Sequence, residues 1–202
     1  MSEDVTATLE ATLTTEVARM YEEVATYPDG DYHFYTGRRA ADMYGYRPED
    51  LDAMPAGAVA AFAGVGCPIE RARFAPRERV VDLGSGAGLD ALIAARAVGP
   101  QGQVVGIELN PVMIEKADAH ARALQASHAE FRQGRIEEPP VEAGFADVVI
   151  SNGVINLSFR KSKVITEVFR ILRPGGRVSI VDVVSARPLA QSIVNDPKLW
   201  AS

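Results

Sequence analysis

Strand and helix patterns alternate regularly over residues 79–184, and this alternation constrains the fold more than any other feature of the sequence. The predicted strands are short, mainly apolar runs at residues 80–83, 104–107, 130–132, 147–151 and 177–184. Strands separated by helical stretches of this length form βαβ units, in which the strands pair in parallel. Because such crossovers are right-handed, the sequence predicts an α/β fold with a doubly wound, mostly parallel sheet covered on both faces.

Cap and turn residues indicate where the helices between these strands begin and end. Asn110 followed by Pro111 predicts an N-cap and a first helical position, opening a helix that runs to about Leu124. Ser158 is expected to cap a later helix, which the Pro-Gly-Gly sequence at residues 174–176 ends.

Residues 1–75 show a different sequence pattern, in which helical segments are interrupted by loops. Apolar residues recur every three or four positions over residues 5–24, which predicts one apolar stripe on a helix. Short helices are expected at 38–44, after Pro48 and at 69–74. We therefore expect two parts, an N-terminal helical lid and acceptor segment at 1–75 and an α/β core at 76–202.

Charge and composition restrict the partners of this chain. The 21 basic and 27 acidic residues give a net charge of −6, and the basic residues are scattered, so nucleic acid is not expected as a partner. No apolar run approaches the ~20 residues of a membrane span, and the polar, acidic start is unlike a signal peptide, so we expect a cytoplasmic protein. Cys67 is the only cysteine, so neither an internal disulfide nor a thiolate metal site is expected.

A glycine-rich loop, Gly-Ser-Gly-Ala-Gly at residues 84–88, directly follows the first predicted strand. Doubly wound sheets bind ligands beyond the carboxyl ends of their strands, where the winding direction switches. Glycine permits unusual backbone angles and lets a ligand approach the main chain closely. The loop is therefore a candidate floor for a ligand site, with a plain strand-to-helix turn as the alternative.

Polar and apolar residues after neighbouring strands extend this candidate site. Asp82 precedes the loop, placed to hold the glycine amides or to meet a ligand ammonium through water. Glu108 ends the second strand, where a carboxylate can accept both hydroxyls of a ribose; the alternative, capping the next helix, is already served by Asn110. Ile136 could pack on a purine and Glu137 could accept from its exocyclic amine, unless both lie in a polar surface loop. Together these residues fit a nucleoside carrying a small polar tail.

A dinucleotide is the competing ligand. Its fingerprint requires a third small residue where this chain has Leu89, and a leucine there hinders close helix packing over a pyrophosphate. Asp82, directly before the loop, also repels phosphate. The sequence therefore disfavours a dinucleotide.

Residues 79–184 resemble the core of class I S-adenosylmethionine methyltransferases, a Rossmann-like fold. The matching motifs are Val-Val-Asp-Leu-Gly-Ser-Gly-Ala-Gly at 80–88, Gly-Ile-Glu-Leu-Asn at 106–110 and Leu-Arg-Pro-Gly-Gly at 172–176. The resemblance implies S-adenosylmethionine as cofactor. The residues that we expect to bind it are Tyr35, Asp82, Gly84, Ser85, Gly86, Glu108, Leu109, Met113, Ile136, Glu137 and Ser151. By that likeness the glycines approach the methionine part, Glu108 binds ribose, and Leu109 and Met113 flank the adenine opposite Ile136.

The chain also resembles arsenite methyltransferases over most of residues 35–184. The likeness rests on Tyr-Gly-Tyr at 44–46, Gly-Val-Gly-Cys-Pro at 64–68 and Val-Ile-Ser-Asn-Gly-Val-Ile-Asn-Leu at 149–157. Two of that family's arsenic-binding cysteines fall on Val65 and Gly153 here, Cys67 replaces an asparagine, and the last cysteine belongs to a C-terminal region that this chain lacks. Because a trivalent arsenical needs soft thiolate ligands, we do not expect arsenite to be the acceptor.

On the acceptor side, two residues are candidate catalytic groups. His33 could act as a general base near neutral pH, with a solvated loop histidine as the alternative. Asn156, beyond the fourth strand with Asn152, could orient an acceptor or cap the local turn. Since methyl transfer to a good nucleophile needs mainly alignment and desolvation, we expect a methyltransferase acting on a small-molecule acceptor. The alternatives are a non-catalytic cofactor-binding or structural module and a truncated methyltransferase fragment.

The end of the chain leads to a separate expectation. The class I core continues with two further strands, whereas Arg187-Pro188 and Asp196-Pro197 disfavour strands in the residues that follow Val184 here. We therefore expect a sheet lacking the last two strands, with residues 177–184 forming an apolar edge. Such edges recruit other strands, so the edge is expected to be covered by a homodimer, by an N- or C-terminal segment, or by a continuation of the chain.

Overall fold

The computed structural model describes residues 34–187 without a break, together with positions 12, 15–17, 19, 20, 22, 23, 26, 27, 30 and 32. Most of the predicted helix over residues 5–24 lies outside the described residues, as does His33. Among the residues described, no helix combines the length and apolar character that crossing a membrane requires.

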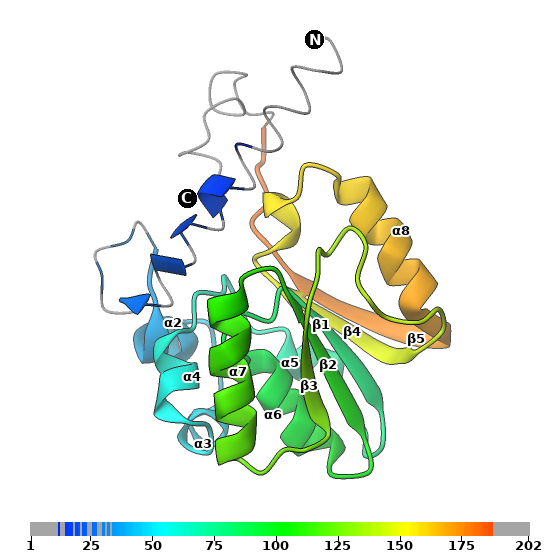
Figure 1. Cartoon of the computed structure of the whole chain (residues 1–202), viewed down its shortest axis with the longest axis horizontal. Coiled ribbons are helices and arrows are strands. Elements are labelled where there is room, and N and C mark those ends of the chain that lie inside the picture. Colours follow the sequence, from blue (N-terminus) through cyan, green and yellow to red (C-terminus); the bar gives the residue numbers. More distant parts are fainter. Residues whose placement is uncertain are drawn as a thin grey trace.

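A five-stranded parallel sheet forms the centre of the molecule, in the order β3-β2-β1-β4-β5 (Figure 1). Its strands are β1 Arg79–Leu83, β2 Gln103–Glu108, β3 Ala129–Gln133, β4 Ala146–Asn152 and β5 Leu172–Val181. The chain winds outward from β1 to β3 and then returns to place β4 on the other side of β1. This reversal confirms the predicted doubly wound topology and creates a switch point at the carboxyl end of β1.

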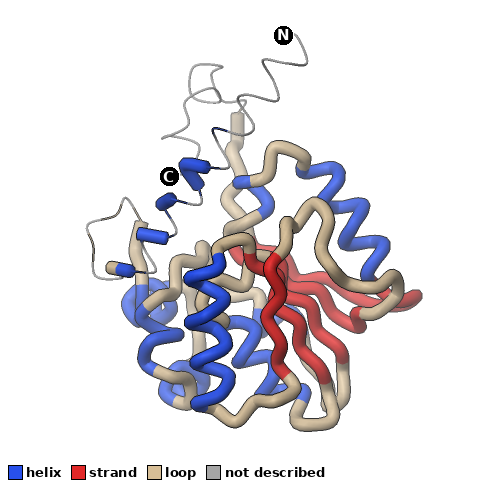
Figure 2. Tube along the Cα trace, in the orientation of Figure 1, coloured by secondary structure: helices blue, strands red, loops and turns tan. Residues whose placement is uncertain are grey.

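Helices cover both faces of the sheet (Figure 2). The helices are α2 Gly37–Met43, α3 Pro48–Asp52, α4 Ala56–Ala60, α5 Ile69–Ala72, α6 Leu89–Val98, α7 Pro111–Ala123 and α8 Lys161–Ile171, with a 3-10 turn at Ile155–Leu157. Helices α2 to α7 lie on one side, and α8 lies on the other (Figure 1).

Each face of the sheet has its own apolar core because neighbouring strand residues point to opposite sides. Val80 packs with Leu92 of α6 and Leu51 of α3 in the larger core. Val81, the next residue, packs with Val164 and Ile171 in the core under α8. Helices α2 to α4 thus share one hydrophobic core with the sheet and bring the N-terminal part of the chain against its carboxyl edge.

The capping prediction at α7 is confirmed, whereas the predicted start of α8 is wrong. Asn110 accepts the Val112 amide N–H through Oδ1 at 2.8 Å, which satisfies one of the free donors of the first turn. Helix α8 begins at Lys161, with Arg160 at the N-cap position. Ser158 instead accepts the Arg160 amide N–H at 3.0 Å and donates its hydroxyl to Glu137. It follows a 3-10 turn at Ile155–Leu157 rather than beginning α8.

The last strand also differs from its predicted bounds, since it begins at Leu172 and ends at Val181. Residues 174–176 do not separate helix from strand, because Leu172 already pairs with Ala146 and a register shift absorbs the extra residues. Helix α4 was not predicted, because its five small residues show no clear apolar stripe. Within the described residues β5 pairs only with β4, so the predicted edge position of the last strand is confirmed.

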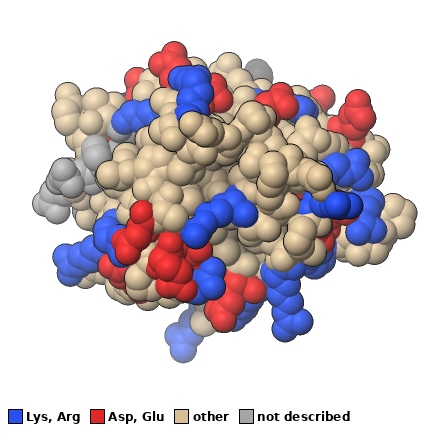
Figure 3. Space-filling view, turned by 90° about the horizontal axis from the view of Figure 1, so that it is seen from below, with Lys and Arg blue, Asp and Glu red and all other residues tan. Residues whose placement is uncertain are grey.

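Charged side chains on the face seen from below, at the amino ends of the strands, are of both signs. Figure 3 shows basic side chains spread over this face with acidic ones between them, rather than gathered in one patch. This face has no continuous basic surface of the kind that follows a phosphate backbone.

Candidate functional site

A cavity of about 170 Å³ lies at the carboxyl ends of β1, β2 and β4, at the switch point of the sheet. The glycine loop forms its floor, and Ala61 and Phe62 after α4 contribute to a wall. Val17, one of the residues in the predicted apolar stripe of the N-terminal helix, also lines it. Segments far apart in the sequence therefore enclose the place where an α/β sheet binds its ligand.

Two glycines of the loop are required for different reasons. Gly84 has a φ of +74°, and a Cβ there would lie 2.4 Å from Cγ2 of Val154, so a side chain has no room. Gly86 also has a positive φ, of +53°, but a Cβ there would meet no atom within 4 Å. Gly86 therefore leaves its backbone open to a ligand in the cavity.

Glu108, at the end of β2, ties the glycine loop to the next turn. Its Oε2 accepts the Gly86 amide N–H, and its Oε1 accepts those of Leu109 and Asn110, all at 2.9 Å. Burial raises the pKa of this carboxyl, and the three amides oppose that rise. Oε1 already accepts two amides, whereas Oε2 accepts one and keeps a lone pair, so Glu108 can hold the loop and accept a ribose hydroxyl at once.

Two buried polar atoms on the cavity floor have no hydrogen-bond partner within the described residues. They are Oδ2 of Asp82 and Oγ of Ser85. Burial, followed by the charges of Asp90 and Glu108, raises the pKa of Asp82 well above its usual value. Folded proteins satisfy most buried polar groups, so these two atoms are candidates for contact with a polar ligand.

Asp90, in the first turn of α6, belongs to a buried cluster that the sequence did not reveal. The Tyr46 hydroxyl donates to its Oδ1, and the Asn152 side-chain amide donates to its Oδ2 at 3.0 Å. Asn152 also accepts the Val65 amide N–H at 2.9 Å and donates to the Gly66 carbonyl at 2.8 Å. The only sequence signal for Asp90 is an acidic residue in the first turn of a mainly apolar helix.

The predicted purine-binding residues meet on another side of the cavity. Leu109, Met113, Ile136 and Glu137 all line it, and Met113 is buried. The Glu137 carboxylate accepts the Ser158 hydroxyl at 2.6 Å and lies 3.4 Å from the Arg135 guanidinium. This side combines apolar surfaces with one oriented carboxylate, which suits a purine ring bearing an amine.

Of the predicted site residues that the structure describes, three are not among those that line the cavity. Ser151 is fully buried, and its hydroxyl donates to the Leu83 carbonyl at 3.0 Å. Tyr35 is 47% exposed, with the Arg39 guanidinium 4.4 Å from its ring centroid. The Asn156 side chain donates to the Val183 carbonyl. The first interaction stabilises the sheet, and the other two lie at the surface.

These features define a class of protein. A glycine loop, a glutamate at the end of β2 and a partly apolar cavity at the switch point of a doubly wound sheet are the elements of a class I S-adenosylmethionine-binding fold. The chain belongs to the methyltransferase domain family, whose profile matches residues 75–202. S-adenosylmethionine is the cofactor of this class, and the unpartnered floor atoms and open Gly86 fit its polar methionine part.

Relatives place the chain near the arsenite methyltransferase group. An arsenite methyltransferase from Halobacterium salinarum is 42% identical over 164 residues, which cover 80% of this chain and 41% of the relative. The crystal structure of an arsenic(III) S-adenosylmethionine methyltransferase from Chlamydomonas reinhardtii matches with a TM-score of 0.60 and 35% identity, covering 80% of this chain and 53% of that one. A demethylmenaquinone methyltransferase from Lactococcus lactis is 36% identical, covering 51% of this chain and 41% of its own length. The chain thus spans about two fifths of the length of these curated relatives.

Proposed function

We propose that this protein transfers the methyl group of S-adenosylmethionine to a small-molecule acceptor. The observation that carries the proposal is the cavity floor, where Oδ2 of Asp82 and Oγ of Ser85 are buried without hydrogen-bond partners beside the open backbone of Gly86. In a turn with only a structural role, two unsatisfied buried polar atoms would destabilise the fold by about 1–3 kcal/mol each without any compensating gain.

Different residues of the cavity would bind different parts of the cofactor. When bound, S-adenosylmethionine supplies an electrophilic methyl group. The backbone at Gly86 and the Asp82 carboxyl would hold the methionine part, Glu108 the ribose, and Ile136 with Glu137 the adenine. Apolar side chains such as Phe62, Val154 and Leu157 line the remainder and would exclude water. Methyl transfer gains most from such alignment and desolvation.

The proposed acceptor is a small molecule other than arsenite. The two positions on which the arsenic-binding cysteines of the related enzymes fall are neighbours here, because a Cβ on Gly153 would lie 3.2 Å from Cγ1 of Val65. They present a methyl surface and a hydrogen in place of two thiols. Cys67, the only thiol of this sequence, is half-buried, and burial raises its pKa, which disfavours the thiolate that an arsenical requires.

Calorimetric titration tests the first part of the proposal. S-adenosylmethionine is expected to bind and NAD is expected not to, because Leu89 and Asp82 oppose a pyrophosphate on this loop. Tight binding of NAD, or no binding of S-adenosylmethionine, would defeat the assignment.

A methyl-release screen over small hydroxyl, amine, thiol and carbon acceptors tests the second part, with arsenite included. We expect turnover with an organic acceptor and none with arsenite. Methylarsenicals produced at a rate that Cys67→Ser abolishes would show that the acceptor assignment is wrong.

A further inference from the structure

Helix α7 presents one face to the glycine loop and to helix α4, which lies beside it (Figure 1). Met113 and His120 are two helical turns apart and therefore lie on the same side of α7. Met113 packs in a small buried cluster with Ala61, at the end of α4, and Ala87 of the loop, and all three line the cavity. His120 is half-buried next to this cluster and is not among the residues that line the cavity.

The imidazole ring of His120 contacts both of these neighbours of α7. Nδ1 lies 3.0 Å from the Ala87 carbonyl oxygen. Since a carbonyl oxygen only accepts, Nδ1 carries the proton in this contact and donates it. On the α4 side, a Cβ on Gly57 would lie 2.6 Å from Nε2, so the ring fills the space that the glycine leaves. One side chain thus bridges the loop that forms the cavity floor and the helix that leads into the cavity wall.

The Ala87 carbonyl depends on this contact because its usual helical donor is engaged elsewhere. In a helix that begins after the loop, the Ala91 amide N–H would be directed to the carbonyl four residues earlier. The Ala91 amide instead donates to the Asp82 carboxylate. Among the described residues no backbone N–H donates to the Ala87 carbonyl, and Ala87 is 4% exposed. Without His120 this buried acceptor would be unsatisfied, and the loop would relax away from its present conformation.

We propose that His120 is a positioning residue that holds the glycine loop against helix α4 and so couples the cofactor floor to the wall beside it. This inference rests on the proposed function, because it concerns how the cofactor-binding loop is held. The open backbone of Gly86 directly precedes Ala87, so the bond to Ala87 fixes the peptide that the cofactor meets. Gly57 lies one helical turn before Ala61, which forms part of the wall.

Calorimetric titration with S-adenosylmethionine tests the hydrogen bond to the loop. His120→Leu keeps an apolar side chain on α7 but removes the donor, and it is expected to weaken binding about fivefold or more. His120→Asn places an amide nitrogen where Nδ1 lies, and it is expected to restore the affinity to within about twofold of that of the unaltered chain.

His128→Leu is the matched control for loss of stability. The His128 ring is also half-buried, and its Nε2 donates to the Ala95 carbonyl at 2.9 Å. Neither residue is among those that line the cavity. The control variant should therefore lose stability, as His120→Leu does, while its affinity for S-adenosylmethionine changes less than about twofold, as expected of a distant site.

Gly57→Ala tests the contact on the other side of the ring. The added methyl group would lie 2.6 Å from Nε2, and the ring can move away only by leaving the Ala87 carbonyl. We expect about a threefold loss of affinity in the otherwise unaltered chain and less than about 1.5-fold in the His120→Asn background, where the side chain is shorter.

Hydrogen exchange measures the coupling between the floor and α4. The Val59 amide donates to the Pro55 carbonyl within the first turn of α4, and Val59 is not among the residues that line the cavity. Saturating S-adenosylmethionine is expected to slow its exchange about tenfold in the unaltered chain and in His128→Leu, but less than about twofold in His120→Leu. A contribution of His120 to stability alone would leave this response to the cofactor unchanged.

The outcomes separate this inference from the proposed function. Unchanged affinity in His120→Leu, equal weakening by His128→Leu, or no restoration by His120→Asn would overturn the positioning role and leave the proposed function standing. Equal protection of Val59 in His120→Leu and in the unaltered chain would do the same. Circular dichroism checks that each variant folds. If His120→Leu does not fold, Gly57→Ala decides, since an equal loss in both backgrounds would overturn the role. No binding of S-adenosylmethionine by the unaltered chain would overturn both proposals.

Discussion

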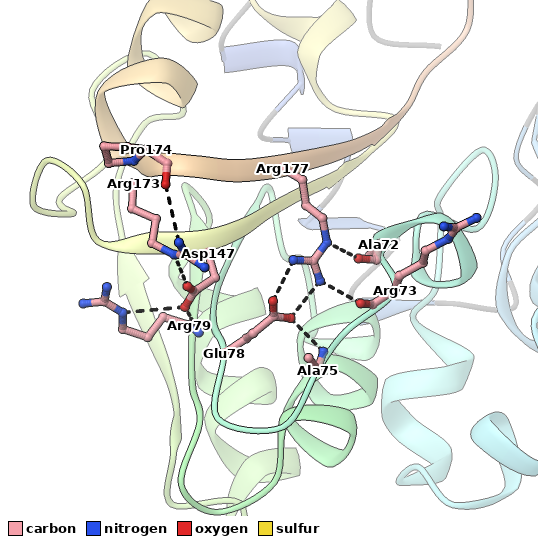
Figure 4. Close-up of polar contacts among 9 residues, drawn as sticks. All are labelled: Ala72, Arg73, Ala75, Glu78, Arg79, Asp147, Arg173, Pro174 and Arg177. Carbon is pink, nitrogen blue, oxygen red and sulfur yellow. Dashed lines mark hydrogen bonds and ion pairs between the residues drawn. The ribbon is translucent and has the colours of Figure 1, made fainter.

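The two ends of the parallel sheet treat their carboxylates in opposite ways. At the amino ends, Glu78 and Asp147 are held by arginines (Figure 4). At the carboxyl ends, Asp82 and Asp90 are buried without a cation, and their pKa values rise. We infer that the ion-paired carboxylates at the amino ends stabilise the folded structure. Asp82 and Asp90 at the carboxyl ends have no cationic partner among the described residues and are available to a ligand.

The amino-end cluster joins the N-terminal part of the chain to the last strand. The Arg177 guanidinium pairs with both Glu78 oxygens, at 2.6 and 2.7 Å, and donates to the Ala72 and Arg73 carbonyls at 2.7 Å each (Figure 4). The Arg177 hydrogen bonds lower the pKa of Glu78 despite its partial burial. One side chain of β5 thus fixes the segment that leads from α5 into β1.

Removal of this arginine is expected to have the largest effect on stability. Arg177→Met should lower the free energy of unfolding by about 3 kcal/mol, because Glu78 loses its cation and two carbonyls lose a donor. Urea unfolding measures the loss. The affinity for S-adenosylmethionine should change less than about twofold, and a large loss of affinity in the folded variant would show that the two ends are coupled.

Removal of the Glu108 carboxylate is the corresponding test at the carboxyl ends of the strands. Glu108→Ala is expected to weaken S-adenosylmethionine binding by about 1–3 kcal/mol, the usual contribution of a charge-assisted hydrogen bond. Glu108→Gln keeps one acceptor oxygen for the loop amides and should lose less. Calorimetric titration of both variants makes the comparison, and an unchanged affinity in Glu108→Ala would contradict the assignment of this residue.

The pH dependence of stability compares both ends in one experiment. The pKa of Asp90 is raised to about 6 in the folded state, so its contribution to stability is complete below pH 4 and is lost as the pH rises through 6. The lowered pKa values of Glu78 and Asp147 act below pH 4, in the opposite sense. The ligand-free protein should therefore lose about 1–2 kcal/mol of stability between pH 5 and pH 7. Chemical unfolding at the two pH values measures this, and Asp90→Asn should reduce the change, while Asp82 and Glu108, whose pKa values are also raised, account for the rest.

The smallest effect on stability is expected at the side of the sheet. Val178 of β5 is 48% exposed, and we propose that a second copy of the chain covers this edge as a homodimer. Val178→Lys should change the stability of the monomer by less than about 0.5 kcal/mol, as is usual for a surface position, while shifting the molecular mass in light scattering toward one chain. A monomeric unaltered chain would contradict the homodimer.

The parts of the fold that depend on local signals could be predicted from the sequence. The positions of β1 to β4, the Asn110 cap and the glycine loop each follow from neighbouring residues, and the structure confirms them. The bounds of α8 and β5 could not be predicted, because pairing of Leu172 with Ala146 is set by tertiary structure rather than by residues 174–176.

The candidate site shows the same division. The residues on the glycine loop and after β2 and β3 line the cavity as expected, because the carboxyl ends of parallel strands converge. At the end of β4 the prediction selected Ser151, whereas its neighbour Asn152 lines the cavity. Adjacent strand residues face opposite ways, and the sequence alone does not fix which one faces the ligand. The Tyr46–Asp90–Asn152 cluster joins positions 44 and 62 residues apart, which no local pattern links.

The Asn152 side chain joins the cavity wall at residues 64–66 to the end of β4 by hydrogen bonds. Its amide accepts the Val65 N–H and donates to the Gly66 carbonyl, so it occupies the place that a peptide group of a neighbouring strand would take. A Cβ on Gly64 would lie 2.4 Å from its nitrogen, so only glycine permits this approach. The wall is thereby bonded to the end of β4 and opens only when these bonds break. The Val65 amide hydrogen should consequently exchange with solvent at a rate closer to that of the central strands than to that of a surface loop.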